Sequence, residues 1–180
     1  MARHTISITN GKGSIELIDG QYSATALVQG YDATTLYPKN VTLVEGTNNY
    51  EFKIAANGTL TLHVTDTGES TGSAVFGSTF VRTDASGTVY GDPVTTGSDG
   101  NAVFNNVPFA ETESPVIYFK QTSSDGGHTF EATVQQVTMT ESTKTVEIKN
   151  PPAPERTFTL VDVNFVNLPI SSGQIILQDT

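Results

Sequence analysis

The chain contains one complete copy and two partial copies of a single β-sandwich pattern. The complete copy covers residues 59–149, residues 5–54 have the pattern of a second half, and residues 157–180 have the pattern of a first half. A half sandwich leaves its inner face and its strand edges without partners. We therefore expect residues 157–180 to complete residues 5–54, either of the same chain or of a neighbouring chain.

An internal repeat supports this division of the chain. Segments that begin 96 residues apart have matching apolar positions, and each is followed by a short linker and another similar strand. A repeat of domain length indicates tandem sandwiches rather than a solenoid, whose period is shorter. The pair at this offset is Val41–Lys53 with Val137–Lys149, and the further corresponding segments are Thr59–Leu62 with Thr157–Leu160 and Gly13–Leu17 with Gly100–Phe104.

Composition favours strands over helices throughout. Charged residues make up only 16% of the chain, and Thr, Ser, Gly and Val are abundant. Alternating runs such as His4–Ile8 and Tyr22–Val28 are separated by turn pairs such as Asp19-Gly20 and Asp99-Gly100. The predicted fold class is all-β, with two small antiparallel Ig-like or prealbumin-like sandwiches, one of them split between the chain ends.

The two linkers bear on whether the halves meet in one chain. Ala55–Gly58 is predicted to be short and bendable, and Asn150–Glu155 to be extended and semi-rigid. If the domains stack end to end, a linker of ~20 Å is too short to return the tail to its own first domain. Side-by-side domains would allow that return. Both arrangements stay open, and we favour exchange between chains.

Charge and residue types exclude several classes of function. The net charge is −10 and the chain has nine Lys and Arg residues, so no nucleic-acid partner is expected. Cysteine is absent, which excludes disulfides and thiolate chemistry. We see no cleavable signal peptide, no cell-wall anchor and no apolar run long enough for membrane insertion.

No constellation of side chains points to catalysis. The histidines, His4, His63 and His128, are far apart in the sequence, and the Asp-rich turns at 83–87 and 98–101 lack the ligand pattern of a calcium loop. No phosphate loop or nucleophile elbow is found. We therefore predict that the chain is not an enzyme and has no catalytic residue, cofactor or metal site.

Five segments in order carry a resemblance to a known family: Gly58–Asp66, Gly77–Gly91, Thr95–Phe109, Ile117–Gln121 and Thr143–Asn150. Together they resemble the prealbumin-like B-type repeat domains of Gram-positive collagen adhesins and pilins. When the C-terminus is joined to the N-terminus, the tail and residues 5–54 resemble the same domain again, in permuted order. The resemblance implies the fold and carries little about function.

Many members of that family carry an intramolecular Lys–Asn isopeptide bond that a buried acid promotes. The resemblance places His63 at the lysine position, Gln121 at the acid position and Asn150 at the asparagine position. Because histidine cannot form the amide and glutamine cannot shuttle its protons, we expect no isopeptide bond.

The predicted function is that of a structural protein that self-associates by terminal strand exchange. It would form a fibre or surface lattice, as a phage virion decoration or fibre protein or as a cell-surface filament subunit, located on a virion surface or outside the cell. Its partners would be copies of itself, head to tail, with a capsid, tail or surface protein as a further candidate. The alternative is a monomeric, circularly permuted, adhesin-like binding module for glycan or protein. The residues predicted to make the exchange are Phe158, Leu160, Val161, Ile175, Ile176 and Leu177 in the tail, and Ile15, Leu17, Tyr22 and Phe52 in the N-terminal half.

Overall fold

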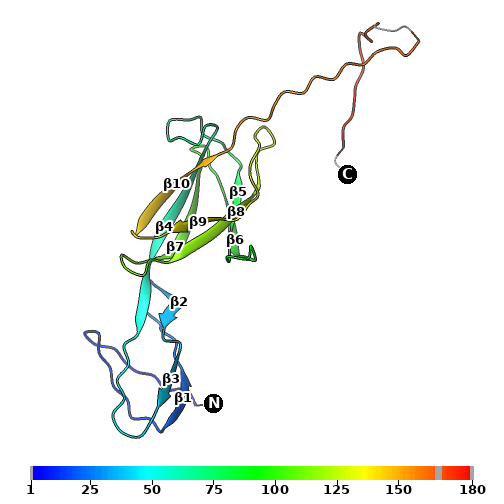
Figure 1. Ribbon diagram of the computed structural model, residues 1–180. Coiled ribbons are helices and arrows are strands. Elements are labelled where there is room, and N and C mark those ends of the chain that lie inside the picture. The colour runs from blue at the N-terminus through cyan, green and yellow to red at the C-terminus, as the bar shows by residue number, and fades with distance from the viewer. Residues whose placement is uncertain (1, 165–167, 179–180) are drawn as a thin grey trace.

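The computed structural model describes residues 2–164 and 168–178, in which all regular secondary structure is β (Figure 1). The predicted all-β fold class is confirmed. Nothing in the described part of the chain forms a helix that could cross a membrane. The strands are β1 Gly20–Ser23, β2 Tyr31–Tyr37, β3 Asn40–Leu43, β4 Lys53–Thr65, β5 Thr79–Thr83, β6 Val89–Thr95, β7 Asn101–Phe109, β8 Val116–Ser123, β9 Gln135–Thr138 and β10 Thr143–Lys149.

Strands β4 to β10 form a two-sheet sandwich. One sheet places β4 between β10 and β7, and the other has the order β6–β5–β8–β9. The last strand, β10, runs parallel to β4, whereas β7 runs antiparallel along the opposite edge of β4. The first and last strands of the sandwich are therefore neighbours in one sheet.

The core of the protein lies almost entirely inside this sandwich. Leu60, Leu62 and Val64 alternate along β4 and have no exposed surface, as expected for the inner face of a strand. Phe80 and Phe119 pack edge to face in the same core, with their ring centroids 6.4 Å apart. Of the fifteen buried hydrophobic residues in the described chain, fourteen lie between Leu60 and Ile148.

The N-terminal region has strands but almost no core. β1 pairs with β3, and β2 pairs with the first residues of β4. Leu36 is the one buried hydrophobic residue in residues 2–54. Many large apolar side chains here are instead exposed: Ile6, Ile8, Ile15, Ile18, Leu27, Val28, Tyr31, Tyr37, Val44, Tyr50 and Phe52. A second layer that would cover them is missing from this part of the structure.

The predicted bendable linker at Ala55–Gly58 is wrong, because these residues lie inside β4. Ala56 pairs with Tyr31 of β2 on one edge and with Phe109 of β7 on the other. A Cβ atom at Gly58 would collide with the backbone oxygen of Ser142, so this glycine serves close packing rather than flexibility. One continuous strand joins the N-terminal region to the sandwich and holds the two end to end (Figure 1).

Some predicted strands do not form. Residues 4–8, 24–28 and 157–160 contain no assigned strand, although their sequences alternate between apolar and polar residues. A strand requires a continuous hydrogen-bonded neighbour, and the described residues give these segments only isolated contacts, such as the bond from the amide of Ala24 to the oxygen of Lys39 (2.7 Å). The missing strands all belong to the two partial copies.

The C-terminal tail leaves the sandwich at the end opposite the N-terminal region (Figure 1). Its first residues are tied to a loop of the sandwich. The amide of Thr129 donates to the oxygen of Pro151 (2.9 Å), and the amide of Ala153 donates to the oxygen of Gly127 (2.8 Å). These bonds direct the chain away from the sandwich.

Candidate assembly site

The C-terminal tail folds into a small hairpin of its own. It lies outside the sandwich, and its closing contacts are all backbone interactions within the tail. These are the amide of Asp162 with the oxygen of Leu168 (3.2 Å), the amide of Ile170 with the oxygen of Leu160 (3.0 Å), and a bridge between Val161 and Pro169.

The complete sandwich contains the same hairpin directly after β4. There the amide of Asp66 bonds the oxygen of Ser73 (3.0 Å), the amide of Val75 bonds the oxygen of Val64 (2.9 Å), and Thr65 bridges Ala74. The first arms of the two hairpins correspond at an offset of 96 residues and the second arms at 95, because the sequence between the arms is one residue shorter in the tail. The tail thus has the backbone pairing that opens a sandwich, without the rest of the sandwich.

This correspondence revises the alignment of the tail. The match of Thr157–Leu160 with Thr59–Leu62 implies an offset of 98, which would place Asp162 at the buried core position of Val64. The observed hairpin places Leu160 there and Asp162 at the turn position of Asp66. An offset of 96 is also the spacing of the repeat from Val41 to Val137.

The tail residues predicted to join the assembly are all accessible. Phe158, Leu160 and Ile175 are exposed by 59%, 41% and 48%, although they correspond to the buried Leu62, Val64 and Phe80. The other predicted tail residues, Val161, Ile176 and Leu177, are exposed too. Large apolar groups in this position favour contact with another protein surface.

None of the residues predicted to receive the tail is fully buried. Ile15 and Phe52 are exposed, and Leu17 and Tyr22 are half-buried. They belong to the N-terminal region, which lies at the far end of the molecule from the tail (Figure 1). The structure therefore places the two predicted groups in separate regions and does not bring them together within one chain.

His63, which the family resemblance places at the lysine position, does not face the core. It lies on the outer face of β4, where its Nδ1 is 2.7 Å from Oε2 of Glu147 on β10. Gln121 and Asn150 are buried, and Nδ2 of Asn150 donates to Oγ of Ser78 (2.9 Å). The residue of β4 that faces the core at this level is Val64, because side chains alternate along a strand.

The Asp-rich turns bind their own backbone. The Asp84 carboxylate accepts hydrogen bonds from the hydroxyl of Ser86 (2.6 Å) and the amides of Ser86 and Thr88, and these bonds hold its pKa below the ordinary value. Hydrogen bonds from the side chain and amide of Asn101 lower the pKa of Asp99 in the same way. The residues with defined positions include no group of three or more His, Asp or Glu side chains that would hold a metal ion.

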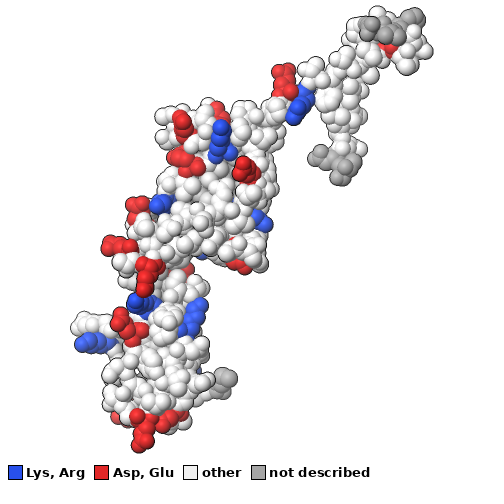
Figure 2. Space-filling model, in the orientation of Figure 1, with Lys and Arg blue, Asp and Glu red and all other residues white. Residues whose placement is uncertain are grey.

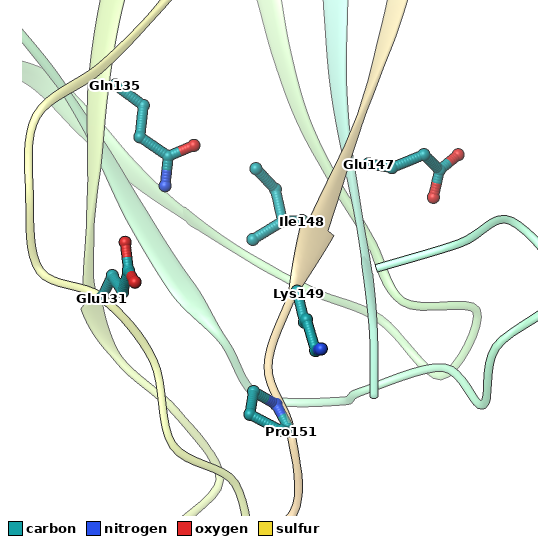
Figure 3. A pocket seen from close by; sticks show the side chains of 6 residues that line it. All are labelled: Glu131, Gln135, Glu147, Ile148, Lys149 and Pro151. Carbon is teal, nitrogen blue, oxygen red and sulfur yellow. The ribbon is translucent and has the colours of Figure 1, made fainter. Parts of the chain in front are cut away.

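An open cleft lies between β10 and the segment that leads into β9 (Figure 3). Glu131 and Gln135 line one side, and Ile148, Lys149 and Pro151 line the other, with Glu147 at the rim. No serine, threonine or histidine is among its lining residues, so the cleft has no hydroxyl nucleophile paired with a histidine base. Its mixed charges suit a solvated sandwich edge.

Charged side chains are interspersed over the visible face of the sandwich and the N-terminal region (Figure 2). The tail differs, since Asp162 is the one charged residue in its described part after Arg156. A nearly uncharged tail can be buried in a protein core with little cost of desolvation.

No protein-family model matches the chain, and no curated protein matches its sequence. Solved structures do match. The streptococcal ancillary pilin is 16% identical over 77% of this chain and 44% of that chain, with a TM-score of 0.51. The minor pilin of Streptococcus agalactiae is 16% identical over 83% of this chain and 67% of that chain, with a TM-score of 0.47.

A third similar structure, the Bacillus anthracis TIE protein, is 19% identical over 63% of this chain and has a TM-score of 0.42. The chain spans 21% of that protein's length. At these identities the likeness concerns the fold, and the likeness to the ancillary pilin supports the prealbumin-like, B-type repeat fold that the sequence predicted.

Proposed function

We propose that this chain is a non-enzymatic structural protein that assembles head to tail by exchange of its C-terminal strands. The observation that carries the proposal is the position of its exposed apolar residues. Most of the exposed large hydrophobic residues in the described chain lie in residues 5–54 or in residues 157–178, on either side of a sandwich that is complete in itself. Each group lacks the layer that the other would supply.

The N-terminal region needs such a layer to be stable. A core of one buried hydrophobic residue, Leu36, is far below what an independent domain requires. Open strand edges and exposed apolar faces also favour pairing with another chain. The tail is the part of this chain whose hairpin matches the missing first half of a sandwich.

The geometry of the sandwich favours exchange between chains over closure within one chain. The amide of Asn150 donates to the oxygen of Thr65 (2.9 Å), so the linker begins at the end of β4 that is farthest from the N-terminal region. The length of β4 puts Lys53 about 40 Å from that point, at ~3.3 Å per residue. Pro151–Arg156 spans only ~19 Å when extended. The tail therefore falls short of its own N-terminal region and is free to enter that of another copy.

The exchange joins different surfaces of two chains, so it need not close and can repeat into a fibre or lattice. Each chain would contribute one complete sandwich and half of two shared ones. The pilin fold agrees with a fibre-forming or adhesin-like surface protein as the general class. Within that class we propose a virion decoration or fibre protein, or a cell-surface filament subunit, located at an exposed surface.

Light-scattering mass across a range of concentrations, with negative-stain images of the same fractions, tests the proposal. We expect open-ended oligomers that disappear when residues 156–180 are removed. A stable monomer of 19.1 kDa at every concentration would overturn the proposal. That result would favour the closed, permuted binding module instead.

A further inference from the structure

We infer the register in which a second copy's tail enters the N-terminal region. Residues 157–161 of the second copy insert as the missing strand between residues 49–53, to which they run parallel, and residues 14–16, to which they run antiparallel. The inference rests on the proposed strand exchange and adds the identity of each residue pair. It follows from transferring the strand pairs of the complete sandwich to the equivalent residues of the incomplete one.

The parallel side follows from the pairing of β10 with β4. The counterpart of each β10 residue lies 96 residues earlier in the sequence, in the N-terminal region. The counterparts of the last β4 residues lie 96 residues later, in the tail. Val146 lies opposite Leu62, which places Tyr50 opposite Phe158 of the second copy. By the same rule, the remaining pairs are Glu51 with Thr159, Phe52 with Leu160, and Lys53 with Val161.

The antiparallel side follows from β7. Gly13–Leu17 has the spacing of Gly100–Phe104, and in the sandwich Ala102 of that segment lies opposite Leu62. Ile15 therefore lies opposite Phe158 of the second copy. The inserted strand then has a hydrogen-bonding neighbour on each edge, as β4 has in the complete sandwich.

The side chains in this register agree with the burial of their counterparts. Phe158 and Leu160 take the positions of Leu62 and Val64, which have no exposed surface, and Phe52 takes the position of Ile148, which is 5% exposed. The outward pair, Glu51 with Thr159, takes the position of the partly exposed Glu147 and His63. Apolar residues meet on the inner face in the pairs made by Phe158 and Leu160, and polar residues meet on the outer face in the pair made by Thr159, as a sandwich requires.

The second missing strand follows from the second arm of the hairpin. At its offset of 95 residues, Ile175 corresponds to Phe80 of β5, which is fully buried. The described tail, which ends at residue 178, reaches the counterpart of Thr83, where β5 ends. The tail is thus long enough to supply both strands with which a sandwich begins.

Cysteine pairing tests the register directly, because the natural chain has no cysteine. Chains with Glu51→Cys are mixed with chains with Thr159→Cys and oxidised gently, and each variant alone serves as a control. The equivalent residues, Glu147 and His63, are direct register partners on neighbouring strands, so the two cysteines would lie side by side on the outer face. A second mixture, Glu51→Cys with Val161→Cys, tests the rival offset of 98, in which Val161 would take the place of His63.

We expect a disulfide-linked species of two chains from the first mixture and little from the second. Preferential linkage in the second mixture would overturn the register and leave the strand exchange standing. The same conclusion would follow if neither mixture linked while light scattering still showed tail-dependent oligomers. Absence of oligomers would overturn the exchange and the register with it. A further variant carries Glu51→Cys and Thr159→Cys in the same chain. If its disulfide forms only within that chain, the tail comes from the same chain, and the inference that a second copy donates it would be overturned.

Discussion

Asn150 and Thr65 are joined by a backbone hydrogen bond of 2.9 Å, which ties the end of β10 to the end of β4. Because β10 runs parallel to β4, both strands finish at the same pole of the sandwich. The N-terminal region begins at the opposite pole, at Lys53. The length of the linker, residues 151–156, therefore decides whether the tail can reach its own N-terminal region or only that of another chain.

Lengthening the linker should convert the assembly into a closed monomer. An insertion of about 30 Gly and Ser residues after Pro152 adds a root-mean-square reach of about 30 Å, enough to return the tail to its own N-terminal region. The intramolecular tail then acts at an effective concentration near the millimolar range and outcompetes other chains at micromolar protein. Light scattering would show a mass near that of one chain. Oligomers that persist unchanged with the longer linker would contradict this account of the geometry.

A charge at an inward tail position should prevent assembly, whereas a charge at the neighbouring outward position should not. Leu160→Asp places a carboxylate at the counterpart of the fully buried Val64, and its burial costs several kcal/mol. We expect association to weaken by more than about hundredfold. Thr159→Asp on the same strand is the matched control and should still assemble. Equal behaviour of the two variants would show that the tail does not enter a core.

Gly58→Ala distinguishes a stiff junction from a flexible one. In a flexible linker, alanine would stabilise the protein by about 0.4–1 kcal/mol through the unfolded state. Inside β4 its Cβ collides with the backbone oxygen of Ser142, and we expect a loss of about 1–3 kcal/mol, measured by urea unfolding. Gly127→Ala is the control, because a Cβ there meets only the Asp125 carboxylate at ordinary contact distance. An increase in stability on Gly58→Ala would support the bendable linker that the sequence predicted.

Residue patterns predicted the all-β fold but not the stiffness of the junction. Alternation and turn residues act locally, so they indicate strands wherever they occur. Gly58 has two readings in a sequence, flexibility or close approach of two backbones, and only the position of Ser142 distinguishes them. The outward orientation of His63 also depends on the register of β4, since a shift of one residue moves a side chain to the other face of a strand.

Strand formation in the partial copies could not be predicted from their sequences alone. His4–Ile8 alternates as regularly as Leu60–Val64, but Leu60–Val64 has β10 and β7 beside it and forms a strand. The register of the tail also required the structure, because the match of Thr157 with Thr59 implied a different offset. The backbone bonds of Asp162 and Asp66 resolved it.

The stability of the sandwich should fall in acid through its turn carboxylates. Hydrogen bonds from Ser86 and Thr88 hold the pKa of Asp84 below 3.8, and the pKa values of Asp99 and Asp125 are lowered as well. A carboxyl group with a lowered pKa in the folded state contributes stability above pH 3.8 that is lost as the pH falls through the folded pKa. Melting temperatures from pH 7 to pH 2 should fall less steeply for Asp84→Asn than for the natural chain. Parallel curves would show that this turn contributes nothing to acid sensitivity.

Removal of the tail should expose the N-terminal region while leaving the sandwich intact. Without residues 156–180, the apolar faces of residues 9–54 have no covering layer from any chain, and their amides should exchange rapidly with deuterium. The amides of β4 that pair with β7 and β10, from Thr59 to His63, should keep their protection, because that core is complete without the tail. Hydrogen exchange at matched protein concentrations measures both regions in one experiment. Full protection of residues 9–54 in the shortened chain would mean that this region folds alone and that the tail is not its missing half.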